Sequence, residues 1–411
     1  MRDDDRALCH ELVLGVLRRR LWLDSSLAHF ANRPIEALDL QVRSALRLGL
    51  YQLRFLSRIP ASAAVNESVQ LVREARLRSA AAFANAVLRR AAREQNYDPT
   101  ASVTDPALKL AIESSHPPWL IERWINSFGL AETRALANAN NEAAPLAFRL
   151  TANSMRQAKR QQILARLANS GARLSASKVS PDAWRVFGAG KIFRDFANEG
   201  LIYFQDEASQ LIAHLVDAKP GDRLLDVCAA PGSKTTQIAA LESKAIIVAG
   251  DLHQHRLRKL RQLANIQGCK SIGLVAYDAA RALPFADASF DRVLVDAPCS
   301  GTGTLRRNPE IRWKITPDNI RDLAAIQSQI LDNAASTIRA GGSLFYSTCS
   351  IEIDENENVV RDFRERHPSF QQAGLEASRS PSLQLENGAI RTWPHRQDVD
   401  GFFITAFRRD V

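Results

Sequence analysis

Strand-like and helix-like segments alternate along the last two hundred residues of the 411-residue chain, and few folds allow that order. Apolar segments typical of buried strands cover residues 223–228, 245–251, 272–278, 291–296 and 343–348. The segments between them predict helices at 234–241, 255–265, 317–338 and 354–364. Such alternation is typical of a mostly parallel, doubly wound sheet. Two later segments, 390–393 and 402–408, predict an antiparallel hairpin that closes the sheet.

Two of these predicted strands end next to a cysteine. The fourth runs into Asp296-Ala-Pro-Cys299, and the fifth is followed at once by Cys349. Ligands of open α/β sheets bind beyond the carboxyl ends of the strands, so we expect Asp296 and both thiols to lie where chemistry takes place. Gly301 and Gly303 come next in the chain and let the backbone pass close to a ligand.

The turn after the first strand predicts a nucleotide-binding loop. It reads Asp226-Val-Cys-Ala-Ala-Pro-Gly-Ser-Lys-Thr235, which is neither G-x-G-x-x-G nor a P-loop, so a pyrophosphate is not favoured. The next two strands end in Asp251 and Asp278, placed to bind ribose hydroxyls and an adenine amino group. For one such Asp, a helix N-cap is an equally good explanation. Three strand-end acids with a glycine turn favour a cationic nucleoside such as S-adenosylmethionine.

The rest of the chain predicts two further domains. Residues 1–100 carry apolar residues at three-to-four spacing, which predicts a compact helical bundle. Residues 101–204 predict a helical linker and a small α/β subdomain, before the α/β domain at 205–411. The expected strands of the subdomain cover 146–151, 172–179 and 183–187, and its expected basic helix covers 155–168.

A formal net charge of +9 suggests a polyanionic partner. The first hundred residues hold sixteen Arg, no Lys and eleven acidic residues, and a guanidinium suits bidentate contact with phosphate. For any one arginine cluster, a solvated helix face is an equally good explanation. No apolar run is long enough to span a membrane, and the acidic N-terminus does not resemble a signal peptide.

The five cysteines are odd in number and show no C-x-x-C spacing, which argues against a disulfide framework and a zinc site. Free thiols indicate a reducing compartment, here the cytoplasm. A lone cysteine is usually a small buried hydrophobe, and we expect this of Cys9 and Cys269.

Several motifs occur together in a characteristic order. In the α/β domain they are residues 205–209 (Gln-Asp-Glu-Ala-Ser), the turn at 226–235, Asp-Ala-Pro-Cys-Ser-Gly-Thr-Gly at 296–303, Ser-Thr-Cys-Ser at 347–350 and Asp-Gly-Phe-Phe at 400–403. This set resembles the S-adenosylmethionine-dependent RNA cytosine-5 methyltransferases of the Nol/Nop/Sun family. Residues 65–69 and 83–90 resemble a NusB-type RNA-binding domain. The combination is similar to the bacterial Sun/Fmu group, which acts on small-subunit ribosomal RNA.

The resemblance implies a Rossmann-like class I methyltransferase fold, preceded by a NusB-like helical domain and an RNA-recognition-like subdomain. It implies methylation at C5 of a cytosine in 16S ribosomal RNA. Cys349 would be the nucleophile that adds to C6, which delivers electron density to C5, and Cys299 would assist release. We expect Asp296 to bind N3 and the amino group of the cytosine, with Lys234 in the same pocket.

The loop and the strand ends are expected to bind the cofactor through Cys228, Ala229, Ala230, Pro231, Gly232, Ser233, Lys234, Asp251, Asp278 and Asp296. Beyond the Gly-Thr-Gly loop, phosphate contacts are expected from Arg306, Arg307, Arg312 and Lys314. The target base has to leave its stack to reach such a pocket. The expected substrate is therefore a flexible region of ribosomal RNA, free or incompletely assembled, and the protein is expected to be a monomer.

Two features depart from the family pattern. Ser233 stands where the family mostly has a second glycine, a mild change that should leave the loop intact. The family's first NusB-type helix would precede Arg6, which suggests a late start of the chain.

Two other classes of protein were weighed against this interpretation. A methyltransferase that acts on an amide or a base amine would place Asn/Asp-Pro-Pro-Tyr/Phe after the fourth strand, and Asp296-Ala-Pro-Cys299 is not that motif. A non-enzymatic RNA-binding assembly factor would need only the NusB-like helices. The two strand-end cysteines and the three acids argue against it.

Overall fold

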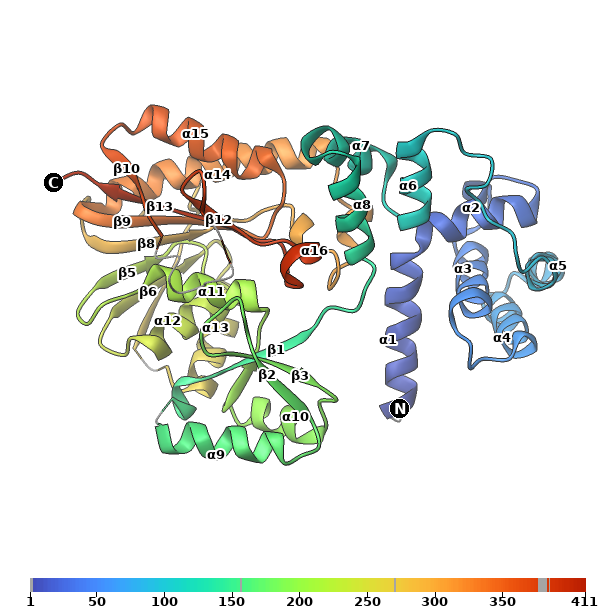
Figure 1. Cartoon of the computed structure of the whole chain (residues 1–411), viewed down its shortest axis with the longest axis horizontal. Helices are drawn as coiled ribbons and strands as arrows, with labels where there is room; N and C mark the ends of the chain where they lie inside the picture. The colour runs from blue at the N-terminus through green and yellow to red at the C-terminus, as the bar shows by residue number, and fades with distance from the viewer. Residues whose placement is uncertain (1–2, 156, 270, 376–382, 384) are drawn as a thin grey trace. The chain divides into compact units, whose positions relative to one another are not determined.

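Figure 1 shows the computed structural model of the chain, which describes residues 3–155, 157–269, 271–375, 383 and 385–411. Its contacts define two compact units. One comprises Met1–Glu142 and Asn308–Lys314, and the other comprises Ala143–Arg307 and Ile315–Val411. No helix among these described residues is long and apolar enough to cross a membrane.

The first unit is helical, as predicted for its first hundred residues. Its α-helices are α1 Asp3–Arg18, α2 Arg20–Ala31, α3 Leu40–Phe55, α4 Ala61–Glu74, α5 Arg78–Arg93, α6 Pro106–Ser114, α7 Pro118–Phe128 and α8 Leu130–Ala139. Leu27, Leu46 and Leu88 are fully buried in the core that α2 to α5 enclose. Each such side chain stabilises the fold by about 1.5–3 kcal/mol. The contacts group α6–α8 with these helices, so the three-domain division stays a prediction.

The second unit begins with a small antiparallel sheet. Its elements are β1 Leu146–Leu150, α9 Gln157–Ala168, β2 Arg173–Ala176, β3 Ala183–Phe187, α10 Lys191–Asn198 and β4 Ile202–Phe204, and the strand order is β2-β3-β1-β4. This βαββαβ connection is that of a ferredoxin-like fold. Phe148 of β1 packs on Phe193 and Phe196 of α10 in its core. The sequence prediction found three of the strands and α9 but missed α10 and β4.

The large sheet is mostly parallel, as predicted. Its order is β11-β12-β13-β9-β8-β5-β6-β7, and the five strands from β9 to β7 run parallel. These elements are α11 Glu207–Val216, β5 Arg223–Asp226, α12 Ser233–Leu241, β6 Ile246–Asp251, α13 Gln254–Gln267, β7 Ile272–Ala276, β8 Phe290–Asp296, α14 Pro317–Thr337, β9 Ile338–Thr348 and α15 Glu357–Arg366. The chain order reverses between β5 and β8, and ligands of doubly wound sheets bind at such a switch point.

The predicted closing hairpin is present at the far edge of this sheet. Its remaining elements are β10 Phe370–Ala373, β11 Leu385–Glu386, β12 Ala389–Arg391, α16 Pro394–Gln397 and β13 Phe403–Arg409. β13 is antiparallel to both β12 and β9.

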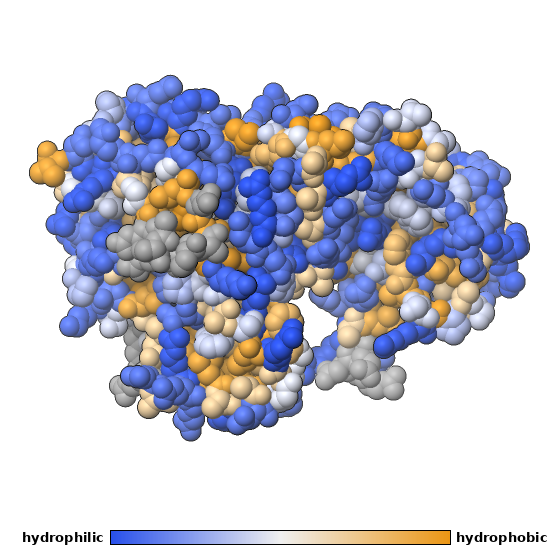
Figure 2. All heavy atoms as spheres, in the orientation of Figure 1, coloured by the Kyte–Doolittle hydropathy of each residue, from blue (hydrophilic) through white to orange (hydrophobic). Residues whose placement is uncertain are grey.

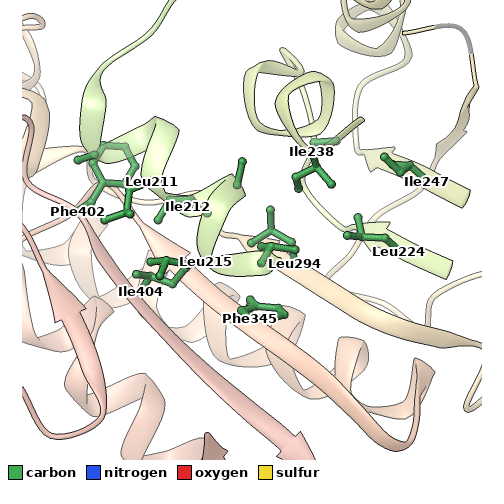
Figure 3. Close-up of a cluster of buried hydrophobic side chains, with 14 of the residues drawn as sticks. Leu211, Ile212, Leu215, Leu224, Ile238, Ile247, Leu294, Phe345, Phe402 and Ile404 are labelled. Carbon is green, nitrogen blue, oxygen red and sulfur yellow. The ribbon is translucent and has the colours of Figure 1, made fainter. Parts of the chain in front are cut away.

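Apolar side chains cover both faces of the large sheet. On one face Leu294 of β8 lies in one apolar cluster with Leu215 of α11 and Ile238 of α12, as Figure 3 shows. On the other face Val293 packs with Leu331 of α14. Because successive strand residues point to opposite faces, this double burial explains the consecutive apolar residues Val293, Leu294 and Val295 of β8. Hydrophilic side chains make up most of the molecular face in Figure 2.

Candidate active site

A cleft of about 400 Å³ lies at the carboxyl ends of β5, β6 and β8. Asp251, Asp278 and Asp296 line it together with Cys299 and Cys349. The structure thus brings the cofactor acids and the two thiols predicted from the sequence into one cavity.

The two cysteines are neighbours because their strands are neighbours. β8 and β9 pair in parallel with Asp296 opposite Ser347, so the segments that follow them lie side by side. The sulfur atoms of Cys299 and Cys349 are 3.3 Å apart, within hydrogen-bonding distance. That hydrogen bond and burial raise the pKa of the Cys299 thiol well above its ordinary value, so Cys299 is a neutral thiol at neutral pH.

Asp296 and Lys234 form an ion pair beside the thiols. Lys234 Nζ donates to Asp296 Oδ2 at 2.7 Å, and Ser347 Oγ donates to Asp296 Oδ1 at 2.8 Å. Burial lowers the pKa of Lys234, but the charge of Asp296 and its hydrogen bond outweigh burial and raise that pKa above its ordinary value. The ammonium also lies 5.1 Å from the centre of the Phe402 ring, a cation–π contact. Lys234 is therefore a fixed cation of the cleft.

The acids at the ends of β6 and β7 differ in their surroundings. Asp251 is 4 % exposed, accepts from His253 N at 2.9 Å and forms an ion pair with Arg256 Nη1 at 3.2 Å. Asp278 lies two residues beyond the end of β7, which stops at Ala276 rather than at Asp278 as predicted. Both carboxylates accept from a backbone N–H two residues ahead. The helix N-cap alternative does not hold for Asp251, because His253 occupies the N-cap position of α13 and no side chain caps that helix.

The predicted loop at residues 228–233 passes over the amino end of α12. Gly232 has φ +106°, and a Cβ atom there would lie 2.6 Å from Leu260, so both conformation and space require glycine. Ser233 begins α12, and its carbonyl accepts from Arg149 Nη2 at 3.0 Å. Burial raises the pKa of the Cys228 thiol far above its ordinary value, which makes it unreactive.

Asp226, which ends β5, lies behind this loop. Its Oδ2 accepts from Thr235 Oγ1 at 2.6 Å, and the carboxyl is 1 % exposed. Burial raises the pKa of Asp226 to about 7, against the effect of the Thr235 hydrogen bond. Asp226 therefore supports the loop as a buried acid and does not line the cleft itself.

Three of the predicted phosphate contacts need correction, and the first two are Arg306 and Arg307. Arg306 is 2 % exposed, and its Nη1 donates to Asp398 at 2.9 Å. Arg307 donates through Nη2 to Asp206 at 2.8 Å and through Nε to Asp400 at 3.0 Å. Their charge is directed to carboxylates of the same unit, so neither is retained as a phosphate ligand.

Arg312 is the third predicted phosphate contact that needs correction. It is fully buried in the helical unit, where its Nη1 donates to Ser115 O at 3.1 Å and to Asn141 Oδ1 at 2.9 Å. Burial lowers the pKa of Arg312 to about 9. Of the four predicted residues only Lys314 is exposed and keeps the role as a proposal.

Cys9 and Cys269 were both predicted to be buried, and the structure confirms this for one of them. Cys269 is buried, as expected, and donates to Thr236 O at 3.4 Å. The prediction for Cys9 is wrong, because residues 5–10 of α1 are all exposed.

A carboxylate that was not predicted from the sequence lies between the two cysteine segments. Glu355 is fully buried and accepts hydrogen bonds from Ser300 and Ser350, the residues that follow Cys299 and Cys349. The serine after each strand-end cysteine was the available signal. Nothing in the local sequence indicated the partner.

The fold and the cleft together define a class of protein. The strand order, the glycine-bearing turn after β5 and the acid after β6 are those of a class I methyltransferase. The residues of the cleft fit S-adenosyl-L-methionine: carboxylates suit its hydroxyls and its positive sulfonium, and Leu252, Ile326 and Ile330 offer apolar surface to an adenine ring.

Comparisons with known proteins identify the family. The 16S rRNA methyltransferase RsmB/F family matches residues 213–408, the NusB family matches 1–93, and the RsmF/B-like ferredoxin-like domain matches 116–192. The probable ribosomal RNA small subunit methyltransferase B of Bacillus subtilis is 34 % identical over 99 % of this chain and 91 % of its own. The Pseudomonas putida ribosomal RNA small subunit methyltransferase B is 37 % identical over 91 % of this chain and 84 % of its own.

Solved structures agree with this result. One titled "Crystal Structure of PH0851" matches with a TM-score of 0.85 at 26 % identity, over 99 % of this chain and 91 % of its own. A methyltransferase homologue from Pyrococcus horikoshii matches with a TM-score of 0.63 at 24 % identity, over 75 % of this chain and all of its own, and shows the fold. The chain therefore belongs to the RsmB/F family of 16S rRNA methyltransferases, and S-adenosyl-L-methionine is its cofactor. The predicted family, fold and cofactor are confirmed.

Proposed function

We propose that this protein methylates C5 of a cytosine in 16S ribosomal RNA through a covalent adduct with Cys349. The observation that carries the proposal is the pair of sulfur atoms, 3.3 Å apart in the cleft beside the Asp296–Lys234 ion pair. A methyltransferase acting on an exocyclic amine or an amide nitrogen needs no thiol, because a nitrogen lone pair attacks directly. C5 of cytosine is a poor nucleophile and needs activation by addition at C6.

The side chains of the cleft divide the work of this reaction. Cys349 adds as the thiolate to C6, which forms a C–S bond and moves electron density to C5. S-adenosyl-L-methionine supplies the methyl group that C5 takes up. A solvent water molecule then takes the C5 proton, and the C–H electron pair re-forms the C5–C6 double bond as the C–S bond breaks and its electron pair returns to the Cys349 sulfur. The neutral Cys299 thiol, 3.3 Å from that sulfur, assists this release by donating a hydrogen bond to the leaving thiolate.

Asp296 would hold the base. Among the described residues, each of its oxygens accepts one hydrogen bond, Oδ2 from Lys234 and Oδ1 from Ser347, and a carboxylate has about four acceptor positions. Capacity therefore remains for N3 and the amino group of cytosine. N3 takes up a proton as Cys349 gives up its thiol proton, and the protonated N3, hydrogen-bonded to Asp296, stabilises the ring during attack at C6, while Lys234 holds Asp296 in place through their hydrogen bond.

The same proposal covers the cofactor and the RNA. Residues 228–233 with Lys234, Asp251 and Asp278 would bind the cofactor, and Asp296 would face its methyl end. Lys314 and exposed arginines of the helical unit would contact phosphates and position the RNA without reading its sequence. A ribosomal RNA substrate, free or incompletely assembled, would place this protein in the cytoplasm, where we propose that it acts as a monomer.

The proposal is tested by labelling unmethylated small-subunit ribosomal RNA with tritium-methyl S-adenosylmethionine. Wild type, Cys349→Ala and Cys299→Ala are compared, with the exposed Cys9→Ala as the matched control. We expect Cys349→Ala to abolish labelling, Cys299→Ala to accumulate a protein–RNA adduct on denaturing gels, and Cys9→Ala to match the wild type. Undiminished labelling by Cys349→Ala would overturn the covalent mechanism, and label at a position other than C5 would overturn the assigned target atom.

A further inference from the structure

Glu355 joins the two segments that carry the thiols. It ends the short 3-10 helix Ile353–Glu355, six residues after Cys349. Its Oε1 accepts from the backbone N–H of Ser300 at 2.8 Å, and its Oε2 accepts from Ser350 Oγ at 2.5 Å and from Ser300 Oγ. One carboxylate thus holds the residue that follows each cysteine.

Two further side chains hold Glu355 itself in place. Gln327 Nε2, on α14, donates to Glu355 Oε1 and to Pro298 O, both at 2.9 Å. Tyr346 OH, on β9, donates to the backbone carbonyl of Glu355 at 2.6 Å. Each carboxylate oxygen therefore receives two hydrogen bonds, and the neighbouring strand and helix fix the direction of the carboxylate.

Filling space in the protein interior does not explain why a carboxylate stands at position 355. Glu355 is fully buried, and burial raises its pKa against the effect of the hydrogen bonds from Ser300 and Ser350. The groups that bond its carboxylate are hydroxyl, amide and backbone N–H donors, all of them neutral. Burying a carboxylate among neutral partners lowers stability, whereas an apolar side chain would fill the same volume without that desolvation cost. A carboxylate at this position is explained if its function is to fix the positions of the residues that donate to it, Ser300 and Ser350.

We propose that Glu355 is a positioning residue that sets the distance between Cys299 and Cys349. It acts through Ser300 and Ser350, and it touches neither sulfur. The inference rests on the roles of the thiols in the proposed function. In that function, Glu355 would keep the sulfur atoms of Cys349 and Cys299 at a fixed distance while the cytosine enters and leaves the cleft.

Substitution of the carboxylate should separate the thiols and leave the cofactor loop in place. Glu355→Gln turns one acceptor oxygen into a donor that faces donors already present. Glu355→Asp keeps the acceptors on a shorter side chain. Residues 228–233 belong to another segment, so the KM for S-adenosylmethionine should change by less than about twofold while kcat falls at least about tenfold.

The spacing of the thiols can be measured apart from catalysis. Phenylarsine oxide condenses with two adjacent thiols, forming two As–S bonds and releasing one water molecule without redox change. Its affinity therefore reports whether Cys299 and Cys349 can be bridged. We expect Glu355→Gln to weaken this affinity at least about tenfold and Glu355→Asp to weaken it less. Cys299→Ala gives the arsenical affinity of a protein in which no bridge between the two thiols can form. Glu357→Gln is the matched control, because it replaces a partly exposed glutamate and removes an ion pair with Arg391.

If Glu355→Gln does not fold, a second variant tests the same proposal. Ser350→Ala removes one of the four hydrogen bonds to the carboxylate and keeps its charge, so we expect a smaller loss of Tm than for Glu355→Gln and arsenical binding weakened at least about threefold. Wild-type arsenical affinity and kcat in Glu355→Gln, or in Ser350→Ala if the former does not fold, would overturn the positioning role. Failure of the proposed function appears differently, as undiminished methyl transfer by Cys349→Ala, whatever the arsenical affinity.

Discussion

At the scale of single residues, the carboxylates around the cleft differ because their partners differ. Asp296 faces a cation, Glu355 faces neutral donors, and Asp226 receives one hydroxyl while its Oδ1 has no partner among the described residues. The difference decides which acid can take part in chemistry. Asp296 opens to the cleft, whereas Asp226 and Glu355 hold backbone segments in position.

The burial of Asp226 predicts a pH dependence of stability. Its pKa is about 7 in the folded protein against 3.8 as the ordinary value, so the folded state binds the proton more tightly than the unfolded state does. The stabilisation is complete below about pH 3.8 and is lost as the pH rises through about 7. Asp226→Asn carries no titrating group there. Between pH 5 and pH 8 we expect the wild-type Tm to fall relative to that of Asp226→Asn by at least roughly 3 °C, measured without cofactor. Parallel Tm curves would contradict this assignment.

At the scale of elements, the cysteine segments are packed so closely that one glycine is indispensable. Gly303 lies in the 3-10 turn Thr302–Thr304, where its N–H donates to Cys349 O at 3.0 Å and its carbonyl accepts from Gly401 N at 2.7 Å. A Cβ at position 303 would lie 2.0 Å from Gly401 O and 2.8 Å from Cys349 O. Both contacts are backbone atoms, which no rotamer change can move.

Gly303→Ala should therefore displace the segment that carries Cys299. We expect kcat to fall at least about tenfold and stability to fall by about 1–3 kcal/mol, the usual cost of overpacking. Gly273→Ala is the matched control, because a Cβ there would meet only ordinary contacts at 3.7 and 3.8 Å. Single-turnover methyl transfer and urea unfolding of both variants test the expectation. Equal kcat in the two variants would show that the segment adapts.

The elements also indicate how far sequence reasoning reaches. The parallel strands follow from apolar runs, because β5, β6, β8 and β9 are largely buried, whereas the edge strand β7 is buried only at Ile272. Phe193 and Phe196, spaced as in a helix, were an available signal for the missed α10. The helix expected at 354–364 instead begins at Glu357, after the chain has turned Glu355 toward the cysteine segments. That contact joins segments distant in the chain, so local pattern cannot contain it.

At the scale of the whole molecule, the net charge of +9 agrees with a nucleic-acid substrate but does not say which cations are available to it. Sequence reasoning chose four basic residues because they follow the Gly-Thr-Gly loop. Folding directs three of them inward to carboxylates and carbonyls, and Arg312 is the clearest case. Arg312 and Lys314 are only two residues apart in the same unit, one buried and one exposed, so they separate a structural role from an RNA-binding role.

We therefore expect Lys314→Ala to weaken RNA binding without loss of stability, and Arg312→Met to lower stability without changing the salt dependence of RNA binding. Lys314→Ala removes a proposed phosphate contact, so we expect an unchanged Tm, weaker binding of a 16S ribosomal RNA fragment, and a slope of log K against log salt smaller by about one. Arg312→Met leaves Ser115 O and Asn141 Oδ1 without their donor, and we expect a stability loss on the order of 2–4 kcal/mol. Below its melting range, Arg312→Met should keep the wild-type salt slope, since a buried guanidinium releases no counterion. A reduced salt slope in folded Arg312→Met would return Arg312 to the RNA-binding surface, and an unchanged slope in Lys314→Ala would remove Lys314 from it.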